Sequence, residues 1–125
     1  MSEDSPRSIL IVDDMFSIRT MVKGVLQHLG YRFFEAGDGQ EGFTFALKLK
    51  PDLVITDYEM PVLNGIELSR KLRAEPTLKK LRIIMLSRSE DGSLEEQGAA
   101  AGVDAFLPKP IDFDELEAVV RRLLP

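Results

Sequence analysis

The chain has 125 residues, of which 44% are hydrophobic and 30% are charged. This length and composition fit one domain that buries a core without disulfides or structural metals. A net charge of −5 and a pI near 4.9 argue against a protein that binds DNA or RNA through the phosphate backbone, so we expect no nucleic-acid partner for this chain. The absence of cysteine excludes thiolate chemistry, and a single histidine, His28, disfavours a multi-histidine metal site.

The N-terminal segment is short and polar and holds no apolar run, so it does not resemble a signal peptide. We expect a disordered tail over residues 1–7 and a single domain over residues 8–125. The longest apolar stretches are far shorter than a membrane-spanning helix requires, which predicts no membrane insertion and a cytoplasmic location.

Short apolar runs alternate with segments of helical spacing, which is the pattern of a parallel α/β sheet. The runs that predict strands span residues 9–12, 32–36, 53–56, 83–86 and 105–107. The first and third are wholly core-like, as expected of strands that are covered on both faces. Five such units in succession predict the α/β class, with a (βα)5 doubly wound parallel sheet of five strands.

Helices are predicted between these strands over residues 18–29, 40–50, 66–74 and 89–101, and after a cap at Asp112. Gly30 ends the first and Pro51 closes the second. The fourth helix carries Gly98 in its interior, where glycine costs roughly 1 kcal/mol relative to alanine. We therefore expect the fourth helix to be the loosest.

Polar side chains follow four of the predicted strands at the point where each strand ends: Asp13, Asp14, Asp57, Ser87 and Lys109. In an open parallel sheet, ligands bind outside the carboxyl ends of the strands. Any one of these residues could be a strand end that meets water. All five together indicate a site.

Three carboxylates at one edge repel each other, since two like charges 4 Å apart cost roughly 4 kcal/mol at an effective dielectric near 20. Either one of them is protonated or a cation lies between them. Mg²⁺ prefers a few carboxylates together with waters and a phosphate, and Lys109 supplies a compact positive charge for that phosphate. Asp57 at the strand tip is the candidate nucleophile, because carboxylates form acyl phosphates in phosphoryl transfer.

The chain resembles the response-regulator receiver domains of two-component signalling, the CheY-like family, from Ile9 to Leu124. The matching residues are Asp13-Asp14, Asp57, Glu59-Met60-Pro61, Asn64-Gly65, Ser87 and Phe106-Leu107-Pro108-Lys109-Pro110. In this order and spacing the motifs are specific for the family. The resemblance implies the strand order 2-1-3-4-5.

The resemblance implies that Asp57 is the phosphoacceptor and takes its phosphoryl group from a histidine kinase or a phosphotransfer protein. Mg²⁺ or Mn²⁺ would be bound by Asp14, Asp57 and the backbone carbonyl of Glu59, with Asp13 holding a metal-bound water. Lys109 would pair with Asp57 and then with a phosphoryl oxygen.

The family's switch positions are Ser87, whose hydroxyl would move to bond the phosphoryl group, and Phe106, which would then turn inward. The change would reach the face formed by the fourth helix, fifth strand and fifth helix, where a downstream protein target would bind. The alternative is that Phe106 is only a core residue. The bond from Lys109 to Pro110 is expected to be cis.

Two departures from the family pattern lie beside the phosphoacceptor. Arg88 stands where the family usually has a small residue, and Glu59 adds a fourth acidic side chain. Arg88 could attract the phosphoryl group, pair with Glu59 or obstruct a partner. Both residues, with neighbouring Ser89, are candidate modulators of the phosphorylation and dephosphorylation rates.

Three functions are compatible with the sequence. We favour a stand-alone CheY-like regulator, monomeric or dimerising on phosphorylation, that is a phosphoacceptor switch and not a turnover enzyme. The alternative is a receiver domain cut from a longer regulator. A haloacid-dehalogenase-like phosphatase is disfavoured, because such enzymes want an acid two residues after a nucleophile on the first strand, where Asp13 is followed by Asp14 and Met15.

Overall fold

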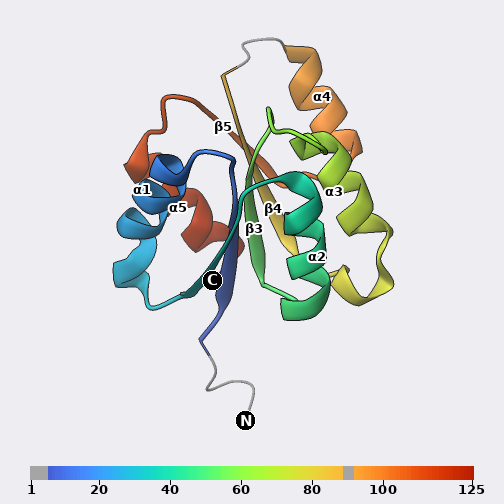
Figure 1. Ribbon diagram of the computed structural model, residues 1–125. Helices are drawn as coiled ribbons and strands as arrows, with labels where there is room; N and C mark the ends of the chain where they lie inside the picture. Colours follow the sequence, from blue (N-terminus) through green and yellow to red (C-terminus); the bar gives the residue numbers. More distant parts are fainter. Residues whose placement is uncertain (1–5, 89–91) are drawn as a thin grey trace.

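Five parallel strands form one sheet in the order β2-β1-β3-β4-β5, which confirms the predicted topology (Figure 1). The computed structural model describes residues 6–88 and 92–125. The strands are β1 (Ser8–Val12), β2 (Arg32–Ala36), β3 (Leu53–Asp57), β4 (Arg82–Ser87) and β5 (Ala105–Pro108). The helices are α1 (Phe16–Leu26), α2 (Gly39–Leu49), α3 (Gly65–Ala74), α4 (Gly92–Ala100) and α5 (Phe113–Leu123), with short 3-10 turns η2 (Gln27–Leu29) and η3 (Pro76–Leu78).

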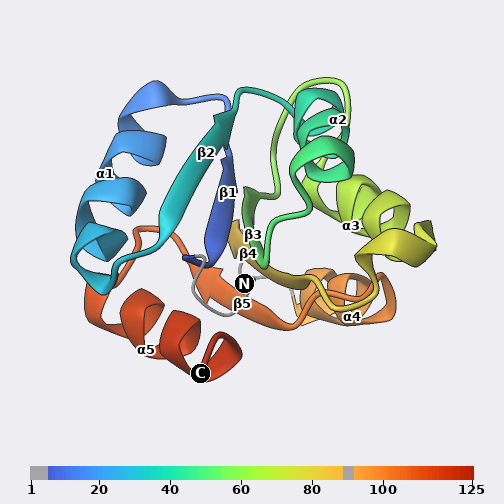
Figure 2. The ribbon, with the colours of Figure 1, turned by 90° about the horizontal axis from the view of Figure 1, so that it is seen from below.

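The sheet is covered on both faces, with α1 and α5 on one side and α2, α3 and α4 on the other (Figure 2). Alternate strand residues point to opposite faces and feed two cores. Leu10 and Val54 pack on the side of α2 and α3, whereas Ile9 and Ile55 pack on the side of α1 and α5. Double coverage explains why every residue of β3 is buried and why its sequence shows no polar alternation.

Polar caps fix the starts of three helices. Asp38 accepts from the Glu41 N–H at α2, and Asp112 caps α5 as predicted. Asn64 and Glu67 form a reciprocal capping box at α3. The first predicted helix is shorter than expected, because its last turn tightens into η2 before the left-handed Gly30.

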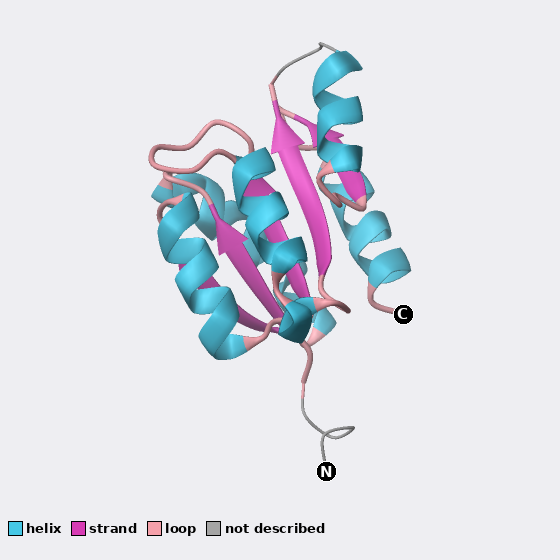
Figure 3. Ribbon diagram, turned by 90° about the vertical axis from the view of Figure 1, so that its right-hand side faces the viewer, coloured by secondary structure: helices cyan, strands magenta, loops and turns pink. Residues whose placement is uncertain are grey.

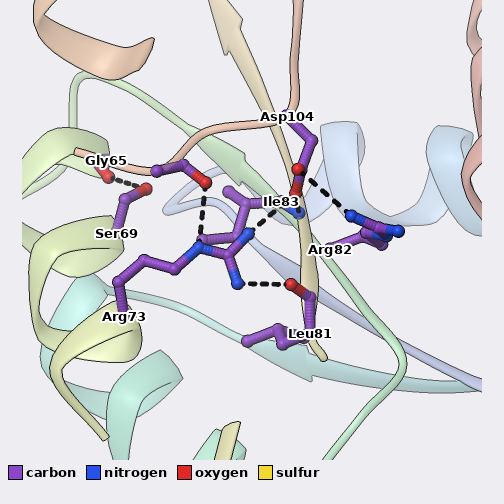
Figure 4. Close-up of polar contacts among 8 residues, drawn as sticks. Gly65, Ser69, Arg73, Leu81, Arg82, Ile83 and Asp104 are labelled. Carbon is purple, nitrogen blue, oxygen red and sulfur yellow. Dashed lines mark hydrogen bonds and ion pairs between the residues drawn. The ribbon is translucent and has the colours of Figure 1, made fainter. Parts of the chain in front are cut away.

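Arg73 of α3 joins three segments at the edge of the sheet where the strands begin (Figure 4). Its guanidinium donates to the carbonyls of Leu81 and Gly102 and pairs with the Asp104 carboxylate at 2.8 Å. The same carboxylate accepts from the Ile83 N–H at 2.8 Å. This network ties α3, the start of β4 and the α4–β5 connection together.

Gly98 of α4 lies directly against the ring of Phe106. The residue is buried, and a Cβ added there would lie 2.5 Å from Cε1 of the Phe106 ring and closer still to its Cζ. The absence of a side chain therefore makes the space that Phe106 occupies against α4. Nothing within the described residues measures how loose α4 is, so that expectation stays a prediction.

No helix in the described part of the chain has the length and apolar character needed to cross a membrane. The predicted tail over residues 1–7 falls mostly on residues 1–5, which lie outside the described residues, as does Ser89.

Candidate functional site

The parallel strands all point toward one edge of the sheet (Figure 3). The polar residues predicted from the sequence lie at the ends of these strands. Asp13 and Asp14 follow β1, Asp57 ends β3, and Lys109 follows β5. One carboxylate oxygen from each of the three aspartates lies within 4.8 Å of the others. Ser87 ends β4 and is buried.

Asp13 is buried and held by several polar contacts. Its N–H donates to the Ala36 carbonyl at 3.1 Å, which joins it to β2. One carboxylate oxygen accepts from the Met15 N–H at 2.9 Å, and the other lies 3.3 Å from Lys109 Nζ. The side chain is therefore fixed before any ligand arrives.

Lys109 bridges two of the three carboxylates, since its Nζ also lies 3.1 Å from Asp57 Oδ1. Both side chains of this pair are largely removed from water. Burial first, and then the charge of Asp13, raise the pKa of the Asp57 carboxyl above its ordinary value, while Lys109 and the Tyr58 backbone act in the opposite direction. Burial of Asp57 therefore outweighs its pairing with Lys109 in setting the pKa of this carboxyl.

A cavity of about 180 Å³ opens at this edge. Its lining residues are Asp14, Met15, Asp57, Glu59, Arg88 and Lys109. Three carboxylates gather around the Lys109 ammonium, and oxygen ligands are what a hard divalent cation takes. The residues present therefore fit Mg²⁺ or Mn²⁺, with Asp14 exposed toward the opening.

The two departures from the family pattern both reach this cavity. Glu59 and Arg88 are exposed and line it, yet no ion pair joins them among the residues that the structure describes. Of the three roles considered for Arg88, pairing with Glu59 is therefore absent from this arrangement.

The loop between β3 and α3 approaches Asp57 closely, which the sequence did not reveal. A Cβ at Gly65 would lie 2.6 Å from the Asp57 carbonyl oxygen, so close packing requires glycine at this position. Val62 adopts a positive φ of 74°, and the Leu63 N–H donates to the Pro61 carbonyl across it. A β-branched residue in that region is strained.

The predicted switch residues lie on adjacent strands. Met85 of β4 pairs with Phe106 of β5, and Ser87 pairs with Pro108. The Lys109 N–H donates to the Ser87 carbonyl at 2.9 Å, and the Lys109–Pro110 bond is cis as predicted. Phe106 is half-buried and packs against the core on the α4 side, so it is placed between the core and the surface.

Arg19 of α1 is a contributor that the sequence analysis missed. Its guanidinium donates to the Asp13 carbonyl at 2.6 Å and to Glu35 of β2 at 3.0 Å. In the sequence it looks like one more polar residue of an amphipathic helix, and only the β1–β2 pairing brings Glu35 beside it.

The family model described as response regulator receiver domain matches residues 9–121. The sporulation initiation phosphotransferase F of Bacillus subtilis is 30% identical over 117 residues, covering 94% of this chain and 93% of that protein. The phosphate regulon transcriptional regulatory protein PhoB of Pseudomonas aeruginosa is 36% identical over 123 residues, covering 95% of this chain and 54% of that protein. The chain thus spans about half the length of several curated relatives that it matches.

Solved structures show the same similarity. The chemotaxis response regulator CheY4 of Vibrio cholerae superposes with a TM-score of 0.88 at 34% identity, covering 95% of this chain and 99% of that one. The receiver domain of the Francisella response regulator 1452 superposes with a TM-score of 0.85 at 29% identity, covering 94% and 95%.

Proposed function

Because the chain belongs to the response-regulator receiver domain family, we propose that it is a phosphorylation switch with Asp57 as its phosphoacceptor. Receiver domains take phosphoryl groups from histidine kinases or phosphotransfer proteins, and such a protein is the proposed donor. The observation that supports this most is the bridge from Lys109 Nζ to Asp57 and Asp13 inside an acidic cavity.

The proposed reaction is an in-line displacement at phosphorus. A carboxylate oxygen of Asp57 forms the new P–O bond while the P–N bond of the donor phosphohistidine breaks. The bonding electron pair leaves with the imidazole nitrogen. The released imidazole ring is neutral, because its other nitrogen already carries a proton or the ring takes one up from solvent. Hydrolysis of the acyl phosphate later returns the Asp57 carboxylate and inorganic phosphate.

Asp14, Asp57 and the Glu59 carbonyl would hold Mg²⁺ or Mn²⁺ directly, and Asp13 would hold a metal-bound water. When bound, the cation neutralises charge that develops on the phosphoryl oxygens. Lys109 is placed to contribute from the protein side, because its ammonium already contacts the nucleophile and can follow a phosphoryl oxygen. Asp57 is buried, so little of the nucleophile is open to bulk water.

The proposed output couples the phosphoryl group to the surface of α4, β5 and α5. Movement of the Ser87 hydroxyl toward the phosphoryl group would change the packing beside Phe106, because Ser87 ends β4 and Phe106 lies on the neighbouring strand β5. A shift from mostly inactive to mostly active needs about 5.5 kcal/mol of differential stabilisation. Charge-assisted contacts from Ser87 and Lys109 are of the right strength to supply a large part of it.

The proposed role is that of a switch and not of a turnover enzyme. A phosphatase would release phosphate from a small ester such as p-nitrophenyl phosphate in many cycles, and loss of that turnover in Asp57→Asn would favour it. The proposed reaction is instead one transfer to Asp57 followed by slow hydrolysis. Glu59, Arg88 and Ser89 are proposed to set that rate.

Whether the chain acts alone or as the receiver of a longer regulator is a separate proposal. Relatives of both kinds match it, one over 93% of its own length and another over 54%. We favour a stand-alone regulator that binds a protein target and is monomeric or dimerises on phosphorylation. Size-exclusion chromatography with and without a phosphoryl analogue distinguishes these two states.

The proposal is tested by intact-mass measurement after incubation with phosphoramidate and Mg²⁺. The wild type is expected to gain one phosphate-sized mass that EDTA prevents. Asp57→Asn is the matched control and should gain nothing. A gain that persists in the variant would place the modification elsewhere and contradict the proposal.

A further inference from the structure

We propose that Arg19 is a positioning residue for the acidic loop that follows β1, and that it raises the affinity of the site for a divalent cation without touching that cation. The inference rests on the proposed function, because it concerns the same cation site. It assigns to Arg19 a role that no motif in the sequence indicated.

The Arg19 side chain joins three elements. From α1 it donates to the Asp13 carbonyl at 2.6 Å, and it donates through Nε to the Glu35 carboxylate of β2 at 3.0 Å. Its guanidinium also lies 5.6 Å from the centre of the Phe16 ring. Only 17% of the side chain is exposed, so these contacts are partly shielded from water. A planar guanidinium can serve all of them at once, which a single ammonium cannot.

The bond to the Asp13 carbonyl has a geometric consequence for Asp14. The peptide unit between the two residues is planar, so holding the Asp13 carbonyl oxygen fixes the orientation of the Asp14 N–H and Cα. Asp13 is itself anchored by its N–H to Ala36 and by its carboxylate to Met15 and Lys109. Arg19 adds a hydrogen bond to the carbonyl oxygen of the peptide unit that joins Asp13 to Asp14.

A pre-oriented pair of carboxylates binds a cation more tightly, because less conformational freedom is lost on binding. Groups that orient metal ligands in this way typically contribute about 10- to 100-fold in metal affinity. Exposed Asp14 depends most on this support, since its side chain is the least enclosed of the three carboxylates.

The sign of the effect separates positioning from simple charge. Arg19 is a cation close to a cation site, so its removal by Coulomb's law alone would strengthen the binding of Mg²⁺. Positioning predicts the reverse, a weaker site. The two explanations therefore cannot be confused in one measurement.

The test is a calorimetric titration of the unphosphorylated protein with Mg²⁺. Arg19→Ala is expected to weaken binding about tenfold. Arg19→Lys keeps the charge and loses the planar guanidinium with its several donors. Its affinity for Mg²⁺ should fall between those of Arg19→Ala and the wild type. Lys23→Ala removes the same charge from the next turn of α1 and is the matched control, for which no weakening is expected.

A second readout needs no metal. Amide hydrogen exchange at Met15, whose N–H donates to the Asp13 carboxylate, should be faster in Arg19→Ala than in the wild type, while amides of β3 are unchanged. Should Arg19→Ala fail to fold, Arg19→Lys carries both measurements.

Affinity in Arg19→Ala or Arg19→Lys equal to or above that of the wild type would overturn the inference. Unchanged exchange at Met15 would do the same. A wild type that binds no Mg²⁺ at this edge would instead contradict the proposed function, and the exchange result would still decide whether Arg19 orders the loop.

Discussion

Gly98 is the position where one added methyl group tests the packing between α4 and β5. In an open helical position, replacing glycine by alanine stabilises a protein by about 0.5–1 kcal/mol. At Gly98 the new Cβ would overlap the Phe106 ring, with Cε1 2.5 Å away. Overpacking of this kind costs about 1–3 kcal/mol when the neighbour has to move. We therefore expect Gly98→Ala to be destabilising by about 1 kcal/mol.

Gly24→Ala is the matched control, because Gly24 lies inside α1 and an added Cβ meets nothing within 4 Å. This variant should gain about 0.5–1 kcal/mol. Urea unfolding of the unphosphorylated protein measures both changes, which are expected to differ by about 2 kcal/mol in total.

The double variant with Phe106→Ala isolates the contact. Without the ring, Gly98→Ala should behave like Gly24→Ala, which gives a coupling energy of about 2 kcal/mol between positions 98 and 106. The reasoning would be refuted if Gly98→Ala stabilised the protein as much as Gly24→Ala while Phe106 is present. In that case the ring would not be confined by α4.

Three further outcomes are expected. The pKa of Asp57 is higher in the folded state than in the unfolded state, so the stability of the wild type falls as pH rises from the unfolded pKa through the folded pKa. In metal-free buffer Asp57→Asn should therefore be more stable than the wild type at pH 7, by a margin that shrinks at pH 4. An equal margin at both pH values in urea titrations would contradict this. Arg73→Met should cost about 2–4 kcal/mol, because the carbonyls of Leu81 and Gly102 lose their side-chain donor and the Asp104 carboxylate loses its closest ion pair. Arg82→Met removes one exposed contact at 3.6 Å and should cost about 0.5 kcal/mol or less. Similar losses for the two variants on thermal unfolding would show that the Arg73 network adds nothing. Val62→Gly should raise the melting temperature, because glycine adopts a positive φ without the strain of about 1–3 kcal/mol that valine carries there, and Val62 is 72% exposed, so little packing is lost. A lower melting temperature would mean that the loop is unstrained.

The sheet and the acidic edge could be predicted because they depend on local patterns. Runs such as 53–56 are buried on both faces, and a polar residue directly after such a run has to lie at the carboxyl edge. The cap at Asp112 follows from a short-range hydrogen bond that a few residues specify. Order and polarity along the chain were therefore sufficient for Asp13, Asp14, Asp57 and Lys109 to be brought together.

Contacts between distant segments could not be predicted in the same way. From the sequence, Gly98 is only a weak point of a helix. The structure shows that the ring of Phe106 from β5 occupies the place where a side chain at position 98 would lie. Arg19 reads as a surface residue until β1 and β2 pair and bring Glu35 beside it. In both cases the chemistry depends on register and side-chain direction, which no single stretch of sequence contains.

Reductive trapping with borohydride tests the central claim most directly, because borohydride reduces an aspartyl phosphate to homoserine and so marks the acceptor permanently. After exposure to a phosphoryl donor and Mg²⁺, peptide mass spectrometry is expected to find homoserine at position 57 alone, and none when EDTA replaces the cation. Homoserine at another aspartate, or an unmarked Asp57 in protein that has gained phosphate, would contradict the assignment of Asp57 as the phosphoacceptor.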